Sequence, residues 1–178
     1  MQTLITYGSR YGSARQYAQE YAGLCGSVAR PFGEVKSIAG YDRVVHFGAL
    51  YAGGVMGIKY ISSLLGAQTE LVIVTVGLAD ITDEENINNI RRSVLSALPR
   101  GVIDRTRIYH LRGAIDYGRL SLGHRTMMAL LYAKAKGLPR EKQNAETRAL
   151  IGTYGGHVSF VDADALRRLA DEMDGADT

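Results

Sequence analysis

Residues 5–22 read ITYGSRYGSARQYAQEYA, an apolar run followed by a turn of small residues and then by a helical pattern. From Ala14 to Ala22, alanines and tyrosines recur at intervals of three and four residues, which places them on one stripe of a helix. A strand, a tight turn and a helix in this order are typical of the first half of a βαβ unit. The turn itself contains Gly8, Ser9, Gly12 and Ser13.

Apolar runs rich in β-branched residues recur at 3–7, 43–50, 70–77 and 106–115, with helical patterns between them. Their continuous hydrophobicity is typical of strands that are covered on both faces of a parallel sheet. A shorter run at 27–32 contains Pro31, which a sheet tolerates at its edge. We therefore predict an α/β fold in three α/β/α layers, with a five-stranded parallel sheet. Of the two common doubly wound orders, 2-1-3-4-5 suits five strands.

Two helix starts are indicated by capping residues. Thr82 followed three residues later by Glu85 forms a capping box before an apolar stripe that ends near Pro99. Asp162 precedes the last helical pattern and is the expected N-cap there.

The length of 178 residues suits one domain, which we expect over 1–174, with a disordered tail at 175–178. Hydrophobic residues make up 46% of the chain and charged ones 22%, as in globular proteins. The start of the chain lacks the features of a signal peptide, and no apolar run approaches the ~18 residues of a membrane span. With a single cysteine, Cys25, the sequence favours a cytoplasmic location.

Charge is distributed unevenly along the chain. Residues 100–142 hold ten Lys and Arg residues against three acidic ones, whereas residues 143–178 hold three against seven. Such a concentration of one sign indicates a partner rather than a fold. The sequence therefore places a partner site in the middle third of the chain.

In open α/β sheets, ligands bind beyond the carboxyl ends of the strands where the strand order reverses. The first of these ends opens a helix, whose free amides and dipole favour an anion. The loop lacks the lysine of a P-loop and the spacing of a Rossmann fingerprint. Amides and hydroxyl groups in this turn therefore suit a phosphate monoester.

The next two strand ends suit a planar group. The stretch FGALYAGGVMGIKYI holds four glycines around Tyr51, and glycines allow a close approach to a flat ligand whose face an aromatic side chain covers. VGLAD, at 76–80, forms the opposite wall. A phosphate at one end and a flat slot between two loops indicate FMN.

Other candidates for chemistry are weak. His46 lies within an apolar strand and is interpreted as a core histidine with satisfied hydrogen bonds. The remaining histidines lack the spacing of metal ligands, and no nucleophile elbow is present, so we assign neither a metal nor a catalytic residue. The chemistry is expected to come from the cofactor.

These residues resemble the flavodoxin-like FMN proteins, and more closely the branch of bacterial menaquinone-dependent protoporphyrinogen oxidase. The resemblance covers nearly the whole chain. The family's phosphate loop, with a hydroxyl residue first, Gly fourth and Thr last, is matched except at its last position, where Ala14 lacks the hydroxyl. The phosphate-binding positions it implies are Ser9, Arg10, Tyr11, Gly12, Ser13 and Ala14.

The same resemblance assigns the walls of the flavin ring site. The loop after the third strand contributes Leu50, Tyr51, Ala52 and Gly53, and the next loop contributes Gly77, Leu78 and Ala79. Residues 112–137 are similar to the aromatic and basic insertion of the oxidase branch, although this chain has no tryptophan.

Two functions remain open at this stage. One is an FMN-dependent oxidoreductase that passes electrons from a small substrate, such as a porphyrinogen, to a quinone or a protein. The alternative is a flavodoxin-like electron carrier without turnover of its own, although the pI near 9.0 is unlike that of the acidic carriers of this family.

Residues 119–142 carry six basic residues and one acidic residue around MMALLYA. They are expected to meet the redox partner or quinone, or to lie on the inner face of a membrane, unless they form an ordinary sheet-covering helix. Aromatic residues are too sparse there for a nucleic-acid platform, and oligomerisation is left open.

Overall fold

The computed structural model describes residues 1–51 and 53–175. Five of its strands form a parallel sheet of order β2-β1-β3-β5-β6, which is the predicted 2-1-3-4-5 order. A two-residue strand, β4, folds back antiparallel on the end of β3. The strands are β1 (Thr3–Gly8), β2 (Ala29–Pro31), β3 (Arg43–Tyr51), β4 (Gly54–Val55), β5 (Glu70–Gly77) and β6 (Thr106–Arg112).

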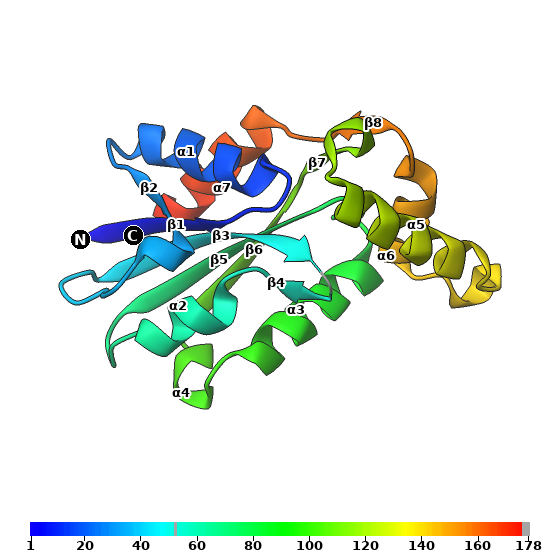
Figure 1. Ribbon diagram of the computed structural model, residues 1–178. Coiled ribbons are helices and arrows are strands. Elements are labelled where there is room, and N and C mark those ends of the chain that lie inside the picture. The colour runs from blue at the N-terminus through cyan, green and yellow to red at the C-terminus, as the bar shows by residue number, and fades with distance from the viewer. Residues whose placement is uncertain (52, 176–178) are drawn as a thin grey trace.

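Helices cover both faces of this sheet (Figure 1). One face is covered by α1 (Ser13–Leu24) and α7 (Ala163–Gly175), and the other by α2 (Ile58–Leu64), α3 (Glu84–Ala97) and α4 (Arg100–Ile103). Tyr17 and Met173 are fully buried on the first face, and Ile61 and Leu71 lie in the core of the second. The α/β/α layering confirms the predicted fold class.

A separate unit follows β6 and packs beyond the carboxyl ends of the strands (Figure 1). Its two short strands pair antiparallel, and its small core contains Ile115, Tyr117 and Met128. The elements are β7 (Ala114–Asp116), η2 (Tyr117–Arg119), α5 (Leu122–Lys136), η3 (Arg140–Lys142), α6 (Ala145–Thr153) and β8 (His157–Ser159); a further 3-10 turn, η1 (Phe32–Glu34), follows β2.

The structure corrects three local expectations. The run at 106–115 is divided between two strands at Gly113, and β7 and β8 form a second sheet that the sequence did not predict. Helix α3 is capped by Asp83, whose carboxylate accepts from the Asn86 amide at 3.0 Å, in place of the predicted Thr82. Asp162 does cap α7, as predicted, by accepting from two amides of its first turn. Of the tail expected at 175–178, Gly175 is the last residue of α7, and 176–178 lie outside the described residues.

Candidate functional site

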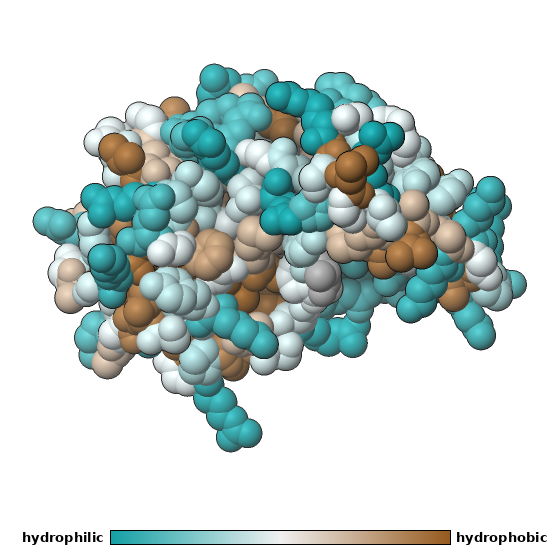
Figure 2. Space-filling model, in the orientation of Figure 1, coloured by the Kyte–Doolittle hydropathy of each residue, from teal (hydrophilic) through white to brown (hydrophobic). Residues whose placement is uncertain are grey.

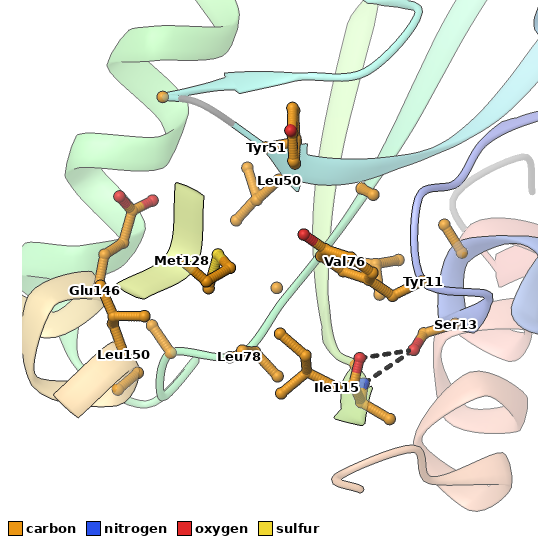
Figure 3. Close-up of a pocket in the computed structure, with 18 of the residues that line it drawn as sticks. Tyr11, Ser13, Leu50, Tyr51, Val76, Leu78, Ile115, Met128, Glu146 and Leu150 are labelled. Atoms are coloured by element: carbon orange, nitrogen blue, oxygen red, sulfur yellow. Dashed lines mark hydrogen bonds between the residues drawn. The ribbon is translucent and has the colours of Figure 1, made fainter. Parts of the chain in front are cut away.

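A cavity of about 520 Å³ lies where the carboxyl ends of β1, β3, β5 and β6 meet the α5–α6 unit (Figure 3). This is the edge at which open α/β sheets bind ligands. Its volume lies within the usual range of small-molecule sites, about 300–1,000 Å³.

The loop between β1 and α1 forms one end of the cavity. Gly12 adopts a φ of 102°, a conformation that L-residues rarely adopt, and this turn lets α1 begin at Ser13. No side chain caps the helix, and its first turn contains no acidic residue. The Ser9 Oγ accepts from the Gly12 amide at 3.1 Å and stabilises the turn. The amides at the start of α1 therefore have no side-chain partner. These free amides, together with the positive end of the helix dipole, make this end of the cavity favourable for an anion.

Ser13 connects this loop to β7. Its Oγ accepts a hydrogen bond from the Ala114 amide at 2.8 Å, drawn as a dashed line in Figure 3. Gly113 makes the approach feasible, because a Cβ there would come within 3.2 Å of the Ser13 side chain. The Ser13 hydroxyl is therefore already engaged in joining two loops of the site.

Tyr11 extends from the loop into the cavity (Figure 3). Its ring meets that of Tyr51 edge to face, with centroids 6.4 Å apart. Its hydroxyl is buried and has no hydrogen-bond partner among the described residues. Burial, and secondarily the nearby Tyr51, raises the pKa of the Tyr11 hydroxyl above its usual value of 10.0. A buried hydroxyl without a partner indicates a position at which a ligand would complete the hydrogen bonding.

Arg10 points elsewhere. Its guanidinium contacts the His124 ring of α5 and lies 5.7 Å from the centroid of the Tyr51 ring. Arg10 is exposed and does not line the main cavity. It thus links the first loop to the α5–α6 unit from outside.

The β3 end forms one long wall of the cavity. Leu50 and Tyr51 lie on its inner surface, and the Tyr51 hydroxyl donates to the Met127 sulfur at 3.5 Å. A Cβ at Gly77 would come within 2.6 Å of Leu50, so the two loops can approach this closely only with glycine there. On the β3 side, Gly53 has a φ of 78° in the turn before β4.

The loop after β5 forms the opposite wall. Leu78 and Ala79 line it, and Arg112 donates to the Leu78 carbonyl at 3.0 Å. The Arg112 guanidinium lies 3.6 Å from the centroid of the Phe160 ring. Through this hydrogen bond and this cation–π contact, Arg112 of the edge strand β6 fixes the position of the loop after β5.

The third wall was missed by sequence reasoning. It comes from α5, within the region 119–142 that had been assigned to a redox partner, a quinone or a membrane, and from α6, which the sequence had not predicted. The only signal for it was the unusual apolar centre of 122–136. The lining residues of this wall are Met127, Met128, Leu131, Glu146, Thr147, Ala149 and Leu150. Gly113, Ala114 and Ile115 also line the cavity without having been predicted, whereas Ala49, Gly54 and Val76 lie within the two stretches expected to flank the ring.

Ten of the residues expected at the cofactor site line the cavity together. Arg10 and Gly12 do not, although Gly12 shapes the loop that does, and Ala52 lies outside the described residues. The ten are Ser9, Tyr11, Ser13, Ala14, Leu50, Tyr51, Gly53, Gly77, Leu78 and Ala79.

His46 lies below the cavity as a fully buried core residue, as the sequence predicted. Its Nε2 lies 2.8 Å from the Met56 carbonyl and its Nδ1 lies 2.9 Å from the Thr6 hydroxyl. Burial lowers the pKa of His46 to about 4, so the ring is neutral at pH 7 and Nε2 carries the proton that Met56 accepts.

Residues 1–51 and 53–175 contain neither a metal-binding cluster nor a membrane-spanning helix. No group of three or more His, Cys, Asp or Glu side chains is arranged to hold a metal ion there. None of the helices in these ranges has the length and apolarity needed to cross a membrane.

The chain shows similarity to a family model and to solved structures. The family model described as a flavodoxin domain matches residues 4–142. Among solved structures, the chain is similar to a mutant of flavodoxin from Pseudomonas aeruginosa, at 19% identity and a TM-score of 0.39, over 85% of this chain and 100% of that one. No curated protein matches the chain.

Proposed function

The chain belongs to the flavodoxin-domain family, and from this premise we propose that its cavity binds FMN and that the protein transfers electrons. When bound, the flavin would supply the capacity to accept and release electrons, which no side chain of the cavity has. The residues of the chain would bind it, orient it and limit the access of water.

One observation carries this proposal. The cavity joins the start of α1, which offers free amides, to a slot between the β3 and β5 ends. An anion at a helix start and a flat apolar group between two loops are the two parts of a flavin mononucleotide.

The phosphate end fits with main-chain donors in the leading role. The Ser9 hydroxyl only accepts a hydrogen bond, from the Gly12 amide, so its hydrogen remains available for donation to an anion. The Ser13 hydroxyl accepts from the Ala114 amide and donates to the Ala114 carbonyl at 3.4 Å, and Ala14 has no hydroxyl. The phosphate would therefore be held by amides at the start of α1 and by Ser9.

The ring end fits through apolar contact. Tyr51 and Leu78 come from opposite walls, and Gly77 allows these walls to approach. The Tyr11 hydroxyl, buried without a partner among the described residues, would gain one from a polar atom of the bound cofactor. We expect Tyr11 to shift its ring when the slot is filled, because its side chain extends into the same space (Figure 3).

The direct test is the visible spectrum of the purified protein, followed by titration of the flavin-free protein with FMN and, as a control, riboflavin. A stoichiometric complex with FMN, and much weaker binding of riboflavin, is the expected result because riboflavin lacks the phosphate. Equal affinity for the two compounds would refute the phosphate site, and no binding of either would refute the proposal.

We further propose that the protein oxidises a small substrate, such as a porphyrinogen, and delivers the electrons to a quinone or a protein. The third wall supports this choice over a simple carrier. Met127, Met128 and Leu150 of α5 and α6 enclose one side of the cavity, which gives a substrate apolar contacts next to the cofactor.

The turnover proposal is tested with FMN-loaded protein, protoporphyrinogen and a soluble quinone under anaerobic conditions. Flavin-dependent turnover is expected, and the variant carrying Arg119→Glu and Arg125→Glu should retain FMN but lose activity with the quinone. If the loaded protein shows no turnover yet exchanges electrons with a reductase, the carrier function is the correct one.

A further inference from the structure

Helix α5 carries an apolar face that nothing in the described chain covers. Met128 and Ala135 are buried beneath it, whereas the side chains of Leu122 and Leu130 are 81% and 68% exposed. A helix turns once every 3.6 residues, so residues that follow Leu122 by 4, 7, 8 and 11 positions lie with it on one stripe of α5. The stripe consists of Leu122, Thr126, Leu130 and Ala133, which are exposed, and Ala129, which is half-buried.

Cations flank this stripe on both sides. By helical position, Arg125 and Lys136 lie along one edge and Lys134 along the other, and all three are exposed. Further exposed cations precede and follow the helix, at Arg119 and at 140–142. In Figure 2, apolar side chains over α5 lie among hydrophilic ones.

These cations are not neutralised within the protein. Across residues 1–51 and 53–175, no ion pair involves any of the six basic residues of 119–142. By contrast, Arg43 and Arg107 of the sheet share Glu70, and Arg167 of α7 meets Asp164. The α5 face therefore combines exposed leucines with unneutralised positive charge.

We propose that this stripe and its flanking cations form a surface that binds an anionic lipid bilayer. Leucines in the centre of the face would enter the boundary of the acyl chains, and the long Lys and Arg side chains on its edges would remain at the level of the headgroups. A second copy of the same face fits less well, because it would bring two sets of unneutralised cations together.

The surface adjoins the cavity. Leu131, the neighbour of Leu130, lines the cavity and is itself 44% exposed. Docking through this face would therefore bring one wall of the cavity close to the bilayer. The proposal does not depend on FMN, since the face is present whether or not the cavity is filled.

The test is co-sedimentation of the full chain with vesicles of 30% phosphatidylglycerol in phosphatidylcholine, and with phosphatidylcholine alone. We expect binding to the anionic vesicles only, weakened strongly when salt rises from 0.05 to 0.5 M because salt screens exposed charges. Each cation removed should weaken binding by roughly fivefold.

Two pairs of matched variants separate this face from general charge and hydrophobicity. Leu122→Asp with Leu130→Asp should abolish sedimentation, whereas Leu24→Asp with Val28→Asp, also at exposed apolar positions, should not. Likewise, Arg125→Glu with Lys134→Glu should release the protein from the anionic vesicles. Arg15→Glu with Lys36→Glu changes the net charge equally but should have only a small effect on sedimentation. All four positions changed in these charge variants are exposed.

Several outcomes would overturn the proposal. Equal sensitivity to both variants of either pair would mean that the face has no special role. A dimer in size-exclusion chromatography that Leu122→Asp with Leu130→Asp dissociates would identify the face as a contact between copies. Sedimentation with neither type of vesicle at 0.05 M salt would refute lipid binding altogether.

Discussion

The Nε2 of His46 donates to the main-chain carbonyl of Met56, 2.8 Å away, and so fixes the turn after β4 to the sheet beneath the cavity. The Met56 amide in turn donates to the Ala49 carbonyl at 3.0 Å. Glycines allow this turn to lie close, since a Cβ at Gly8 or Gly48 would collide with Met56 or Val55. A buried histidine therefore positions the wall that carries Tyr51.

We expect His46→Asn to weaken both the fold and the binding of FMN. An asparagine amide can reach the Thr6 hydroxyl but is too short to reach the Met56 carbonyl, which would remain unpaired at a cost of about 1–3 kcal/mol. His46→Gln, which extends as far as Nε2, should restore most of the loss. Urea unfolding and FMN titration of both variants provide the measurement. Equal effects of the two substitutions would indicate lost packing rather than the lost hydrogen bond.

The same histidine gives the fold a dependence on pH. Burial lowers the pKa of His46 from 6.5 to about 4, so between these values the unfolded state binds a proton that the folded state does not. The free energy of unfolding is therefore highest above pH 6.5 and falls as the pH falls towards 4, by at most about 1.4 kcal/mol per pH unit. The total loss from His46 is on the order of 3 kcal/mol.

His110 acts in the same window, since burial followed by the charge of Arg91 lowers its pKa to about 4 as well. Urea unfolding at pH 7.5, 6, 5 and 4.5 should show the decline in the parent protein. His46→Gln should flatten it without removing it, because His110 remains. An unchanged slope in that variant would show that His46 does not titrate in this range.

The layered fold could be predicted from the sequence because hydrophobic periodicity alone indicates it. Continuous apolar runs gave the strands, and Pro31 placed the short β2 at the sheet edge, where it lies. The cap of α3 could not be placed as securely. Asp83 and the neighbouring Thr82 can both cap a helix, and the choice depends on where the loop after β5 delivers the chain.

The candidate site could be predicted only in part. The glycine-rich loops after β3 and β5 could be identified as two walls of the cavity, because the strand order brings the carboxyl ends of these strands together. The α5–α6 wall depends on how a second unit packs on the first, through contacts such as Tyr51 to Met127, and no local pattern encodes such a contact. Likewise, nothing in the sequence signals that the Ser13 hydroxyl is engaged by Ala114, more than 100 residues away.

Tyr11→Phe should separate the stability of the empty protein from its affinity for FMN. The hydroxyl is buried without a partner among the described residues, so its removal should leave the empty protein as stable as before, or more stable by up to about 1 kcal/mol. If the hydroxyl gains a bond to the cofactor, FMN should bind about tenfold more weakly.

Tyr60→Phe is the control for this substitution. The Tyr60 hydroxyl donates to the Val35 carbonyl at 2.8 Å, on the opposite face of the sheet from α1 and outside the cavity. Its removal should lower stability by about 1 kcal/mol and leave FMN affinity unchanged. The same pattern in both variants would show that Tyr11 has no role in binding.

Gly12→Val should abolish the retention of FMN while leaving the fold largely intact. Gly12 has a φ of 102°, and a β-branched residue strongly disfavours that conformation, so the turn must change shape. No atom lies within 4 Å of a Cβ built there, so strain in the backbone, and not a clash, would be the cause. The amides at the start of α1 would then lose their orientation towards the cavity.

Gly40→Val provides a matched control, because Gly40 also has a positive φ, 86°, with open space around a Cβ, but lies before β3 at the other end of the sheet. Both variants should lose about 1–3 kcal/mol of stability, from the same kind of strain. Only Gly12→Val should release the flavin, as measured by spectra before and after dialysis. Stoichiometric flavin in the dialysed Gly12→Val protein would place the phosphate elsewhere, because the β1–α1 turn could then be rebuilt without loss of the cofactor.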